Sequence, residues 1–187
     1  MTPEPPQGEA KKKLPVPIII VIVLAVAFGA CSCIGVLAAI AIPNFLKFQG
    51  RSKQAECRTQ LKGAYVAERG YYTEHNRYSE NPEELGYAPE GKRSVMLFGH
   101  DAEPVGNGPE ADALAGAIRS HATGTLGVSG TCPECEVVIG CAANVDSDED
   151  ADVWTVSTAD RKSRSGKTIS NGVPYNDYND IIGAEGD

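Results

Sequence analysis

The chain begins with a polar segment and then enters one long apolar run. Residues 1–17 are rich in Pro, Glu and Lys, a composition typical of a disordered tail. Residues 14–46 are apolar apart from Ser32 and Asn44. About 20 apolar residues, each rising about 1.5 Å along a helix, cross the hydrocarbon core of a bilayer. The pattern therefore predicts a cytoplasmic tail at 1–17 and a single membrane helix at 18–46.

A different helical pattern continues over residues 47–78. Its apolar positions follow the spacing i, i+4, i+7 and i+8, at Cys57, Leu61, Ala64 and Tyr65. This spacing places them on one face of a helix, with most of the basic residues off that face. Because an apolar helical face needs a surface to bury it, we expect this amphipathic helix to continue the anchor and to pack against a sheet.

Residues 79–187 have the alternation and turn residues of a small globular domain. Strands are predicted at 94–98, 135–143 and 152–158, with a short helix at 112–120 opened by an Asp112 cap. On the second strand, Val137, Ile139 and Cys141 share one face. Residues 121–130 are expected to form a loop or a weak edge strand. The predicted fold class is α+β, a long N-terminal helix packed on a small antiparallel sheet.

Charge is distributed unevenly along the chain. The formal net charge is -8, yet residues 47–77 carry seven basic and three acidic residues, and residues 131–187 carry four basic and twelve acidic ones. A basic helix followed by an acidic domain is not the pattern of a nucleic-acid-binding domain, and a solvated surface explains it more simply. No nucleic-acid partner is expected.

Four cysteines lie outside the apolar run, at Cys57, Cys132, Cys135 and Cys141. Six positions along one strand span about 20 Å, whereas disulfide-bonded Cα atoms lie within about 7 Å, so Cys135 and Cys141 cannot pair. The buried helix face and strand face favour Cys57–Cys141, which leaves Cys132–Cys135 as a tight Cys-Pro-Glu-Cys loop. The alternatives are a redox Cys-x-x-Cys motif, which should open a helix, and a zinc site, which needs further ligands.

The connection between the last two predicted strands is strongly acidic. Aspartates occupy every second position, at Asp146, Asp148, Asp150 and Asp152. Alternate oxygen ligands in a loop can turn toward one hard cation, so the pattern predicts a calcium site, although the glycine and distal glutamate of an EF-hand are missing. A solvated acidic loop is the alternative. Asp177 and Asp180 either contribute to this site or form a second acidic turn.

No motif supports an enzyme class. Ser165 to Thr168 read like the end of a phosphate-binding loop, but Arg161 stands where the first glycine is needed. The three histidines are isolated from any nucleophile. A thiol oxidoreductase that uses Cys132 and Cys135 is the remaining enzymatic alternative. We expect no catalytic residues and no required cofactor, with calcium as an optional ligand.

The end of the apolar run is unusually specific. Residues 35–49 read GVLAAIAIPNFLKFQ, and residues 51–54 and 61–79 continue the pattern. This stretch resembles the N-terminal helix of type IV pilins and of the pseudopilins of type II secretion. The resemblance implies a pilin fold and partners among pilin-like subunits and pilus or secretion assembly proteins. It also implies a single pass through the bacterial inner membrane, a periplasmic C-terminal domain, and a place in a cell-surface filament if the subunit assembles.

The resemblance weakens upstream. Aligning Gly35 and Pro43 with the glycine and proline of the family places Val21 where prepilins have the glycine of their cleavage site. Val26 then stands at the acidic position, whose side chain is thought to register a subunit against its neighbour's amino terminus. The cleavage region is therefore degenerate.

These patterns predict a membrane-anchored, pilin-like structural protein that acts as a minor filament or assembly component. The alternative is a stand-alone membrane-tethered binding or sensing module that reuses a pilin scaffold. Val21 and Val26 favour the alternative. The intact GVLAAIAIPNF stretch favours the first interpretation, because a plain anchor would need only generic hydrophobicity.

Overall fold

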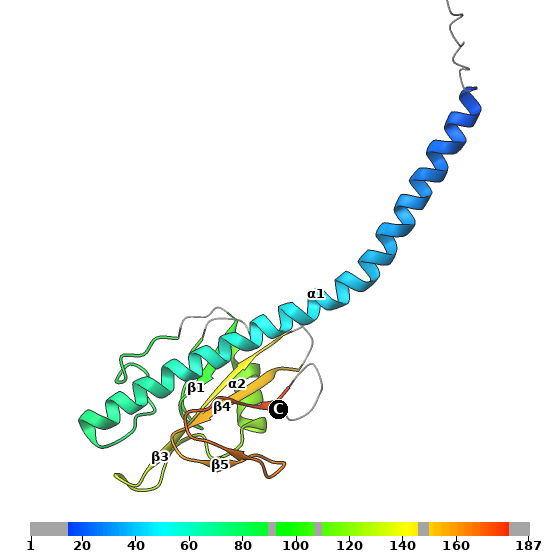
Figure 1. Ribbon diagram of the computed structural model, residues 1–187. Helices are drawn as coiled ribbons and strands as arrows, with labels where there is room; N and C mark the ends of the chain where they lie inside the picture. The colour runs from blue at the N-terminus through cyan, green and yellow to red at the C-terminus, as the bar shows by residue number, and fades with distance from the viewer. Residues whose placement is uncertain (1–14, 90–92, 107–109, 146–149, 180–187) are drawn as a thin grey trace, which may run out of the picture. The chain divides into compact units, whose positions relative to one another are not determined.

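The computed structural model describes residues 15–89, 93–106, 110–145 and 150–179 (Figure 1). Contacts between residues divide the chain into two units, Met1–Phe45 and Leu46–Asp187. The helix α1 (Val16–His75) contributes residues to both units.

In the first unit the described chain is helical from Val16 onward, and its large apolar side chains face solvent. The exposed fraction is 65% for Val21, 79% for Phe28 and 67% for Leu37. The isolated chain thus leaves this apolar surface uncovered. Within the described residues, no helix has both the length and the apolar character that crossing a membrane requires.

The second unit is built on an antiparallel sheet of five strands. Its centre is the pair β3 (Glu136–Ala143) and β4 (Asp152–Ser157), in register from Val138 with Ser157 to Ala143 with Asp152. The strand order is β1-β3-β4-β7, and β2 also pairs with β3. These outer strands are β1 (Ser94–Leu97), β2 (Gly127–Ser129) and β7 (Tyr175–Tyr178). A separate pair joins β5 (Arg161–Lys162) to β6 (Thr168–Ile169).

A helix covers each face of the sheet, so the core has two layers. On one face α1 buries Cys57, Leu61 and Ala64. On the other face α2 (Ala111–His121) buries Leu114, Ala115 and Ile118. Because successive residues of a strand point to opposite faces, β3 serves both layers. It contributes Val137, Ile139 and Cys141 to the α1 side and Val138 and Ala142 to the α2 side.

The fold class expected from the sequence, α+β with a long N-terminal helix and an antiparallel sheet, is confirmed. The strands β1, β3 and β4 lie within the predicted segments 94–98, 135–143 and 152–158. The weak edge strand expected in 121–130 is β2.

Three local features differ from the predictions. The predicted Asp112 cap is wrong, because Glu110 occupies the N-cap position of α2 and makes no side-chain capping bond among the described residues; Asp112 lies in the first turn. In the first turn, the negative charge of Asp112 still interacts favourably with the helix dipole. The helix α1 ends at His75, before the expected 78, because Asn76 takes a positive φ of 54° that a helix cannot continue. The short strands β5, β6 and β7 were not predicted.

Candidate functional site

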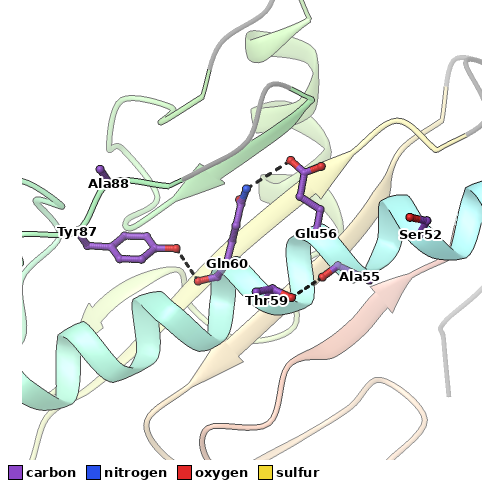
Figure 2. Close-up of a pocket in the computed structure, with 7 residues that line it drawn as sticks. All are labelled: Ser52, Ala55, Glu56, Thr59, Gln60, Tyr87 and Ala88. Carbon is purple, nitrogen blue, oxygen red and sulfur yellow. Dashed lines mark hydrogen bonds between the residues drawn. The ribbon is translucent and has the colours of Figure 1, made fainter.

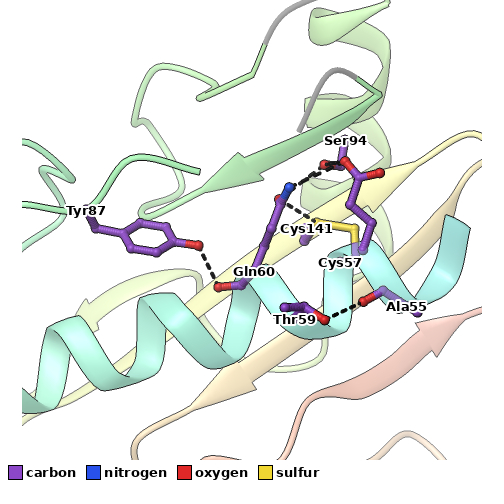
Figure 3. The surroundings of a disulfide bond; sticks show 8 residues. Ala55, Cys57, Thr59, Gln60, Tyr87, Ser94 and Cys141 are labelled. Carbon is purple, nitrogen blue, oxygen red and sulfur yellow. Dashed lines mark hydrogen bonds between the residues drawn. A yellow bond between two sulfur atoms is a disulfide. The ribbon is translucent and has the colours of Figure 1, made fainter. Parts of the chain in front are cut away.

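The disulfide between Cys57 and Cys141 joins α1 to the central strand β3 (Figure 3). Its Cα atoms are 5.6 Å apart, its ends are 84 residues apart in sequence, and both cysteines are fully buried. This is the pairing that the sequence favoured. The bond fixes the amphipathic part of α1 against the sheet, so the helix cannot leave the sheet while the bond is intact.

A polar network lies beside this disulfide, between α1 and β1. The Ser94 hydroxyl lies 2.8 Å from Glu56 Oε1 and 3.1 Å from Gln60 Oε1. The Tyr87 hydroxyl donates to the Gln60 carbonyl over 2.8 Å (Figure 2). Gln60 and Ser94 are both buried, and buried polar groups need such partners. The network therefore sets the position of α1 along the sheet.

Next to the network is a hollow of about 520 Å³, whose lining residues are drawn in Figure 2. It is lined by Ser52, Ala55, Glu56, Thr59, Gln60, Tyr87 and Ala88. Its polar groups are hydroxyls, an amide and one carboxylate, with no nucleophile beside a base, as nucleophilic catalysis would require. In the described part of the chain, no group of three His, Cys, Asp or Glu side chains could hold a metal ion. The hollow is thus a polar junction between elements.

Glu68 is a buried carboxyl on the sheet-facing side of α1. Its side chain is fully buried, Oε2 accepts a hydrogen bond of 3.3 Å from the Ser79 amide, and Oε1 has no partner among the described residues. Burial raises the pKa of Glu68 to about 7; the Ser79 bond lowers it and the charge of Glu80 raises it further. The sequence signal was available, because Glu68 follows Leu61 and Ala64 on the apolar face, but the prediction missed it.

The loop after α1 is fastened to the sheet through Glu80. Its Oε1 accepts a 2.7 Å hydrogen bond from the Val128 amide. The carboxylate sits between two glycines: a Cβ on Gly127 would lie 2.2 Å from Glu80 Oε1, and one on Gly99 would lie 2.3 Å from Oε2. Only residues without a side chain leave room for it. The Glu80 carboxylate thus lies where three separate segments meet and bonds one of them, which no local sequence pattern predicted.

The second disulfide, Cys132–Cys135, closes the turn between β2 and β3. Its ends are only three residues apart in sequence, and both cysteines are half-buried. Inside the turn, the Pro133 carbonyl accepts a 2.6 Å hydrogen bond from the Tyr72 hydroxyl of α1. This pairing, too, is the one that the sequence favoured. It precedes a strand, as β3 begins at Glu136.

The aspartates of the predicted calcium loop are distributed differently. Asp146 and Asp148 lie outside the described residues. Asp150 is exposed and accepts a 3.4 Å hydrogen bond from the Tyr178 hydroxyl. Asp152 is fully buried as the first residue of β4. The calcium site therefore stays a prediction.

The expectation that Asp177 belongs to an acidic turn is wrong. Asp180, the other residue named for that turn, lies outside the described residues. Asp177 is part of β7 and is buried, and the Thr155 hydroxyl donates a hydrogen bond to it. Burial raises the pKa of this carboxyl, whereas the hydrogen bonds and the nearby Arg161 charge lower it. The carboxyl is a buried member of the sheet, so it is not a loop ligand.

Comparison with known proteins agrees with this architecture. No protein-family model matches the chain. The chain is similar to the Type IV major pilin protein PilA of Myxococcus xanthus (strain DK1622), with 33% identity over an alignment of 189 positions that covers 79% of this chain and 86% of the relative. With the α1 helix and the antiparallel sheet already in place, this similarity shows that the chain belongs to the type IV pilin family.

Proposed function

We propose that this chain is a structural subunit that assembles with other pilin subunits into a cell-surface filament. The observation that carries the proposal is the row of exposed apolar side chains at the start of α1, such as Phe28 and Leu37. Burying apolar surface gains roughly 25 cal/mol per Å², so such a surface is strongly favoured to find a cover. Similarity to a major pilin supports other subunits as the cover in the assembled state.

Before assembly, the same surface needs a different cover. We propose that residues 18–46 hold the subunit in the bacterial inner membrane, with the domain from residue 79 onward in the periplasm. The apolar run in the sequence and the exposure of Val21 and Val26 support this assignment. A periplasmic location is also consistent with the two disulfides, because disulfides persist in oxidising compartments.

Val21 and Val26 favour a minor position in the filament or a role in its assembly. A subunit with valine at the acidic position offers no charge to a neighbour's amino terminus. It would therefore contribute less to subunit registration than a neighbour with an acid there. The acidic loop between β3 and β4 is an additional candidate contact with partners or with calcium.

A second function, a stand-alone membrane-tethered sensing module, is favoured by the same two valines. Because the similarity to a filament protein extends over 79% of the chain, including the domain as well as the helix, filament assembly is the better supported function. No arrangement in the described residues favours catalysis, so we propose a structural role for the chain.

The test is expression of the full-length chain with a C-terminal tag in a host that has prepilin peptidase. Intact mass and the N-terminus are measured in the membrane fraction and in material sheared from the cell surface. A shortened chain in the sheared fraction is expected, and a peptidase-deficient host is the control. A full-length chain confined to the membrane would overturn the filament proposal and favour the sensing module.

A matched pair of variants sharpens the test. If registration needs an acid, then Val26→Glu should raise the amount of sheared chain relative to Val26→Gln, which has a similar shape without the charge. Equal amounts from the two variants would exclude a role for this position in registration.

A further inference from the structure

The amphipathic part of α1 carries a straight row of basic side chains. The basic stripe consists of Arg51, Arg58, Lys62 and Arg69, which are separated by seven, four and seven residues and are all exposed. Residues three, four and seven apart lie on the same face of a helix, so the four form one line that is about 27 Å long at 1.5 Å per residue. The stripe runs beside the sheet-facing side of the helix.

The contacts of the stripe within its own chain do not neutralise it. Arg58 lies over the Trp154 ring at 5.5 Å, and Arg69 over the Tyr72 ring at 6.0 Å. Lys62 donates to the Gly172 carbonyl. None of these partners is a carboxylate. Across the described residues, the single salt bridge joins Arg77 to Glu84, outside the stripe.

A hollow along the stripe gives it a place for an anion. It has a volume of about 400 Å³ and is lined by Ala55, Arg58, Thr59, Lys62 and Pro174. Two cations and a hydroxyl border one small space, so a carboxylate entering it would meet charged donors from two sides.

An acidic groove lies elsewhere on the domain, between the loop after α1 and the loop after β1. It has a volume of about 980 Å³. Its walls carry three exposed acids, Glu83, Asp101 and Glu103, whose carboxylates have no partner among the described contacts. The other two acids of the groove already have partners, since Glu80 bonds the Val128 amide and Glu84 pairs with Arg77.

The walls of this groove are held in place. On one side, Glu80 fastens the loop after α1 to β2. On the other, Arg119 of α2 donates to the carbonyls of His100 and Ala102, over 2.8 Å and 3.3 Å. A preorganised surface loses little conformational entropy on binding, so the backbone that carries the three carboxylates needs little rearrangement to meet a partner.

We propose that the basic stripe of one copy of this chain docks into the acidic groove of a second copy. Among the described residues, no ion pair neutralises the stripe or the three groove acids Glu83, Asp101 and Glu103. The two surfaces are opposite in charge, and each borders a hollow that could receive side chains of the other. Such complementarity gives specificity and orientation to an interface more than raw affinity. The proposal rests on the proposed function for its setting, since it names the surfaces through which neighbouring subunits meet.

Crosslinking between two tagged copies tests the docking directly. One copy carries Ala55→Cys, at the hollow of the stripe, and the other carries Ala102→Cys, between Asp101 and Glu103. Both are full-length, carry different epitope tags, and have Cys31→Ala and Cys33→Ala to remove other thiols. A short bismaleimide is added to intact cells. We expect a product with both tags, which is absent when either engineered cysteine is omitted.

Charge reversal then identifies the contact. Arg51→Glu/Arg58→Glu in the first copy, or Glu83→Lys/Glu103→Lys in the second, should lower the crosslinked product about tenfold, or about 1.4 kcal/mol, because like charges would then face each other. Combining the two reversed copies should restore it. The control Glu74→Lys/Glu134→Lys makes the same change in net charge at exposed acids outside the groove and should leave the product unchanged.

The outcomes separate the docking from the filament proposal. The docking would be overturned if groove reversal left the product unchanged, as expected if the stripe bound lipid headgroups instead. It would also be overturned if combining the two reversed copies failed to restore the product. Both conclusions hold even if sheared filaments form. A charge-dependent product without sheared filaments would support the docking and contradict the filament proposal. If a reversed variant does not fold, the unreversed pair decides: its product should fall as salt rises from about 0.05 M to about 0.5 M, and a constant yield would overturn the docking.

Discussion

The two faces of the sheet are covered by helices in different ways. On the α1 face, a disulfide joins helix and strand, and buried polar groups such as Gln60 and Glu68 lie among the apolar side chains. On the α2 face, the cluster around Leu114, Ile118 and Val153 has no covalent bond to the sheet. Buried polar groups lie on this face too, where Thr155 donates a hydrogen bond to Asp177.

The difference shows two ways to hold a helix in place. On the α1 face, the covalent bond helps to offset the desolvation cost of a buried carboxyl such as Glu68. The α2 face has no such bond and depends on close contact. In the proposed filament, other subunits would cover the exposed surfaces of α1, so a strong attachment of α1 to its own domain would serve assembly. The predictions below separate the two modes of attachment.

Removal of the Cys57–Cys141 disulfide should have the largest effect. Cys57→Ala/Cys141→Ala opens a loop that spans 84 residues, so the free energy of unfolding should fall by about 4 kcal/mol. Urea unfolding of the full chain in mild detergent, followed by fluorescence of the single tryptophan, Trp154, measures it. Cys132→Ala/Cys135→Ala opens a much shorter loop and is the control. Equal losses in the two variants would contradict the account.

The charge state of Glu68 should have the next largest effect. Burial raises its pKa from 4.5 to about 7, so between these values the folded chain holds a proton that the unfolded chain has released. The free energy of unfolding should therefore fall as the pH rises from 4.5 to about 7, by about 3 kcal/mol from this group. Glu68→Gln should flatten this slope and be more stable than the parent chain at pH 8. An unchanged slope in Glu68→Gln would contradict the assignment.

The α2 face should respond to small changes in volume. A Cβ on Gly140 of β3 would lie 2.2 Å from Ile118 Cγ2, so Gly140→Ala should lower the free energy of unfolding by about 2 kcal/mol through overpacking. Ile118→Ala makes space for the new methyl group. Gly140→Ala should therefore cost less free energy of unfolding when it is added to Ile118→Ala than when it is added to the parent chain. Gly116→Ala, where nothing lies within 4 Å of the new methyl group, should stabilise α2 slightly. Thermal unfolding of the four variants decides the point.

The end of α2 should show the smallest effect. Arg164 donates to the last carbonyls of the helix, Ser120 at 3.1 Å and His121 at 3.0 Å. A cation here stabilises a helix C-terminus by about 1 kcal/mol or less. Arg164→Ala should lose this amount, and Arg164→Lys should retain part of it. If both variants unfold like the parent chain, the arginine has no role in holding α2.

Much of the α1 face could be predicted from the sequence. The spacing of Cys57, Leu61 and Ala64 identifies a helical face, and the alternation of Val137, Ile139 and Cys141 identifies the strand face opposite it. Both patterns are local and repeat with the period of the element that they form. The two disulfide pairings could be favoured from these faces because a strand keeps Cys135 and Cys141 too far apart to bond.

The tertiary structure alone decided the contacts between segments that are distant in the chain. The carboxylate of Glu80 fits between Gly99 and Gly127. Asp177 is buried in a strand that the polar sequence around it did not predict. The spacing of the basic stripe can be identified in the sequence, but the acidic groove forms only where two loops meet in the folded domain. Periodicity is set by the local backbone, whereas burial and charge complementarity depend on neighbours that the chain brings together only when it folds.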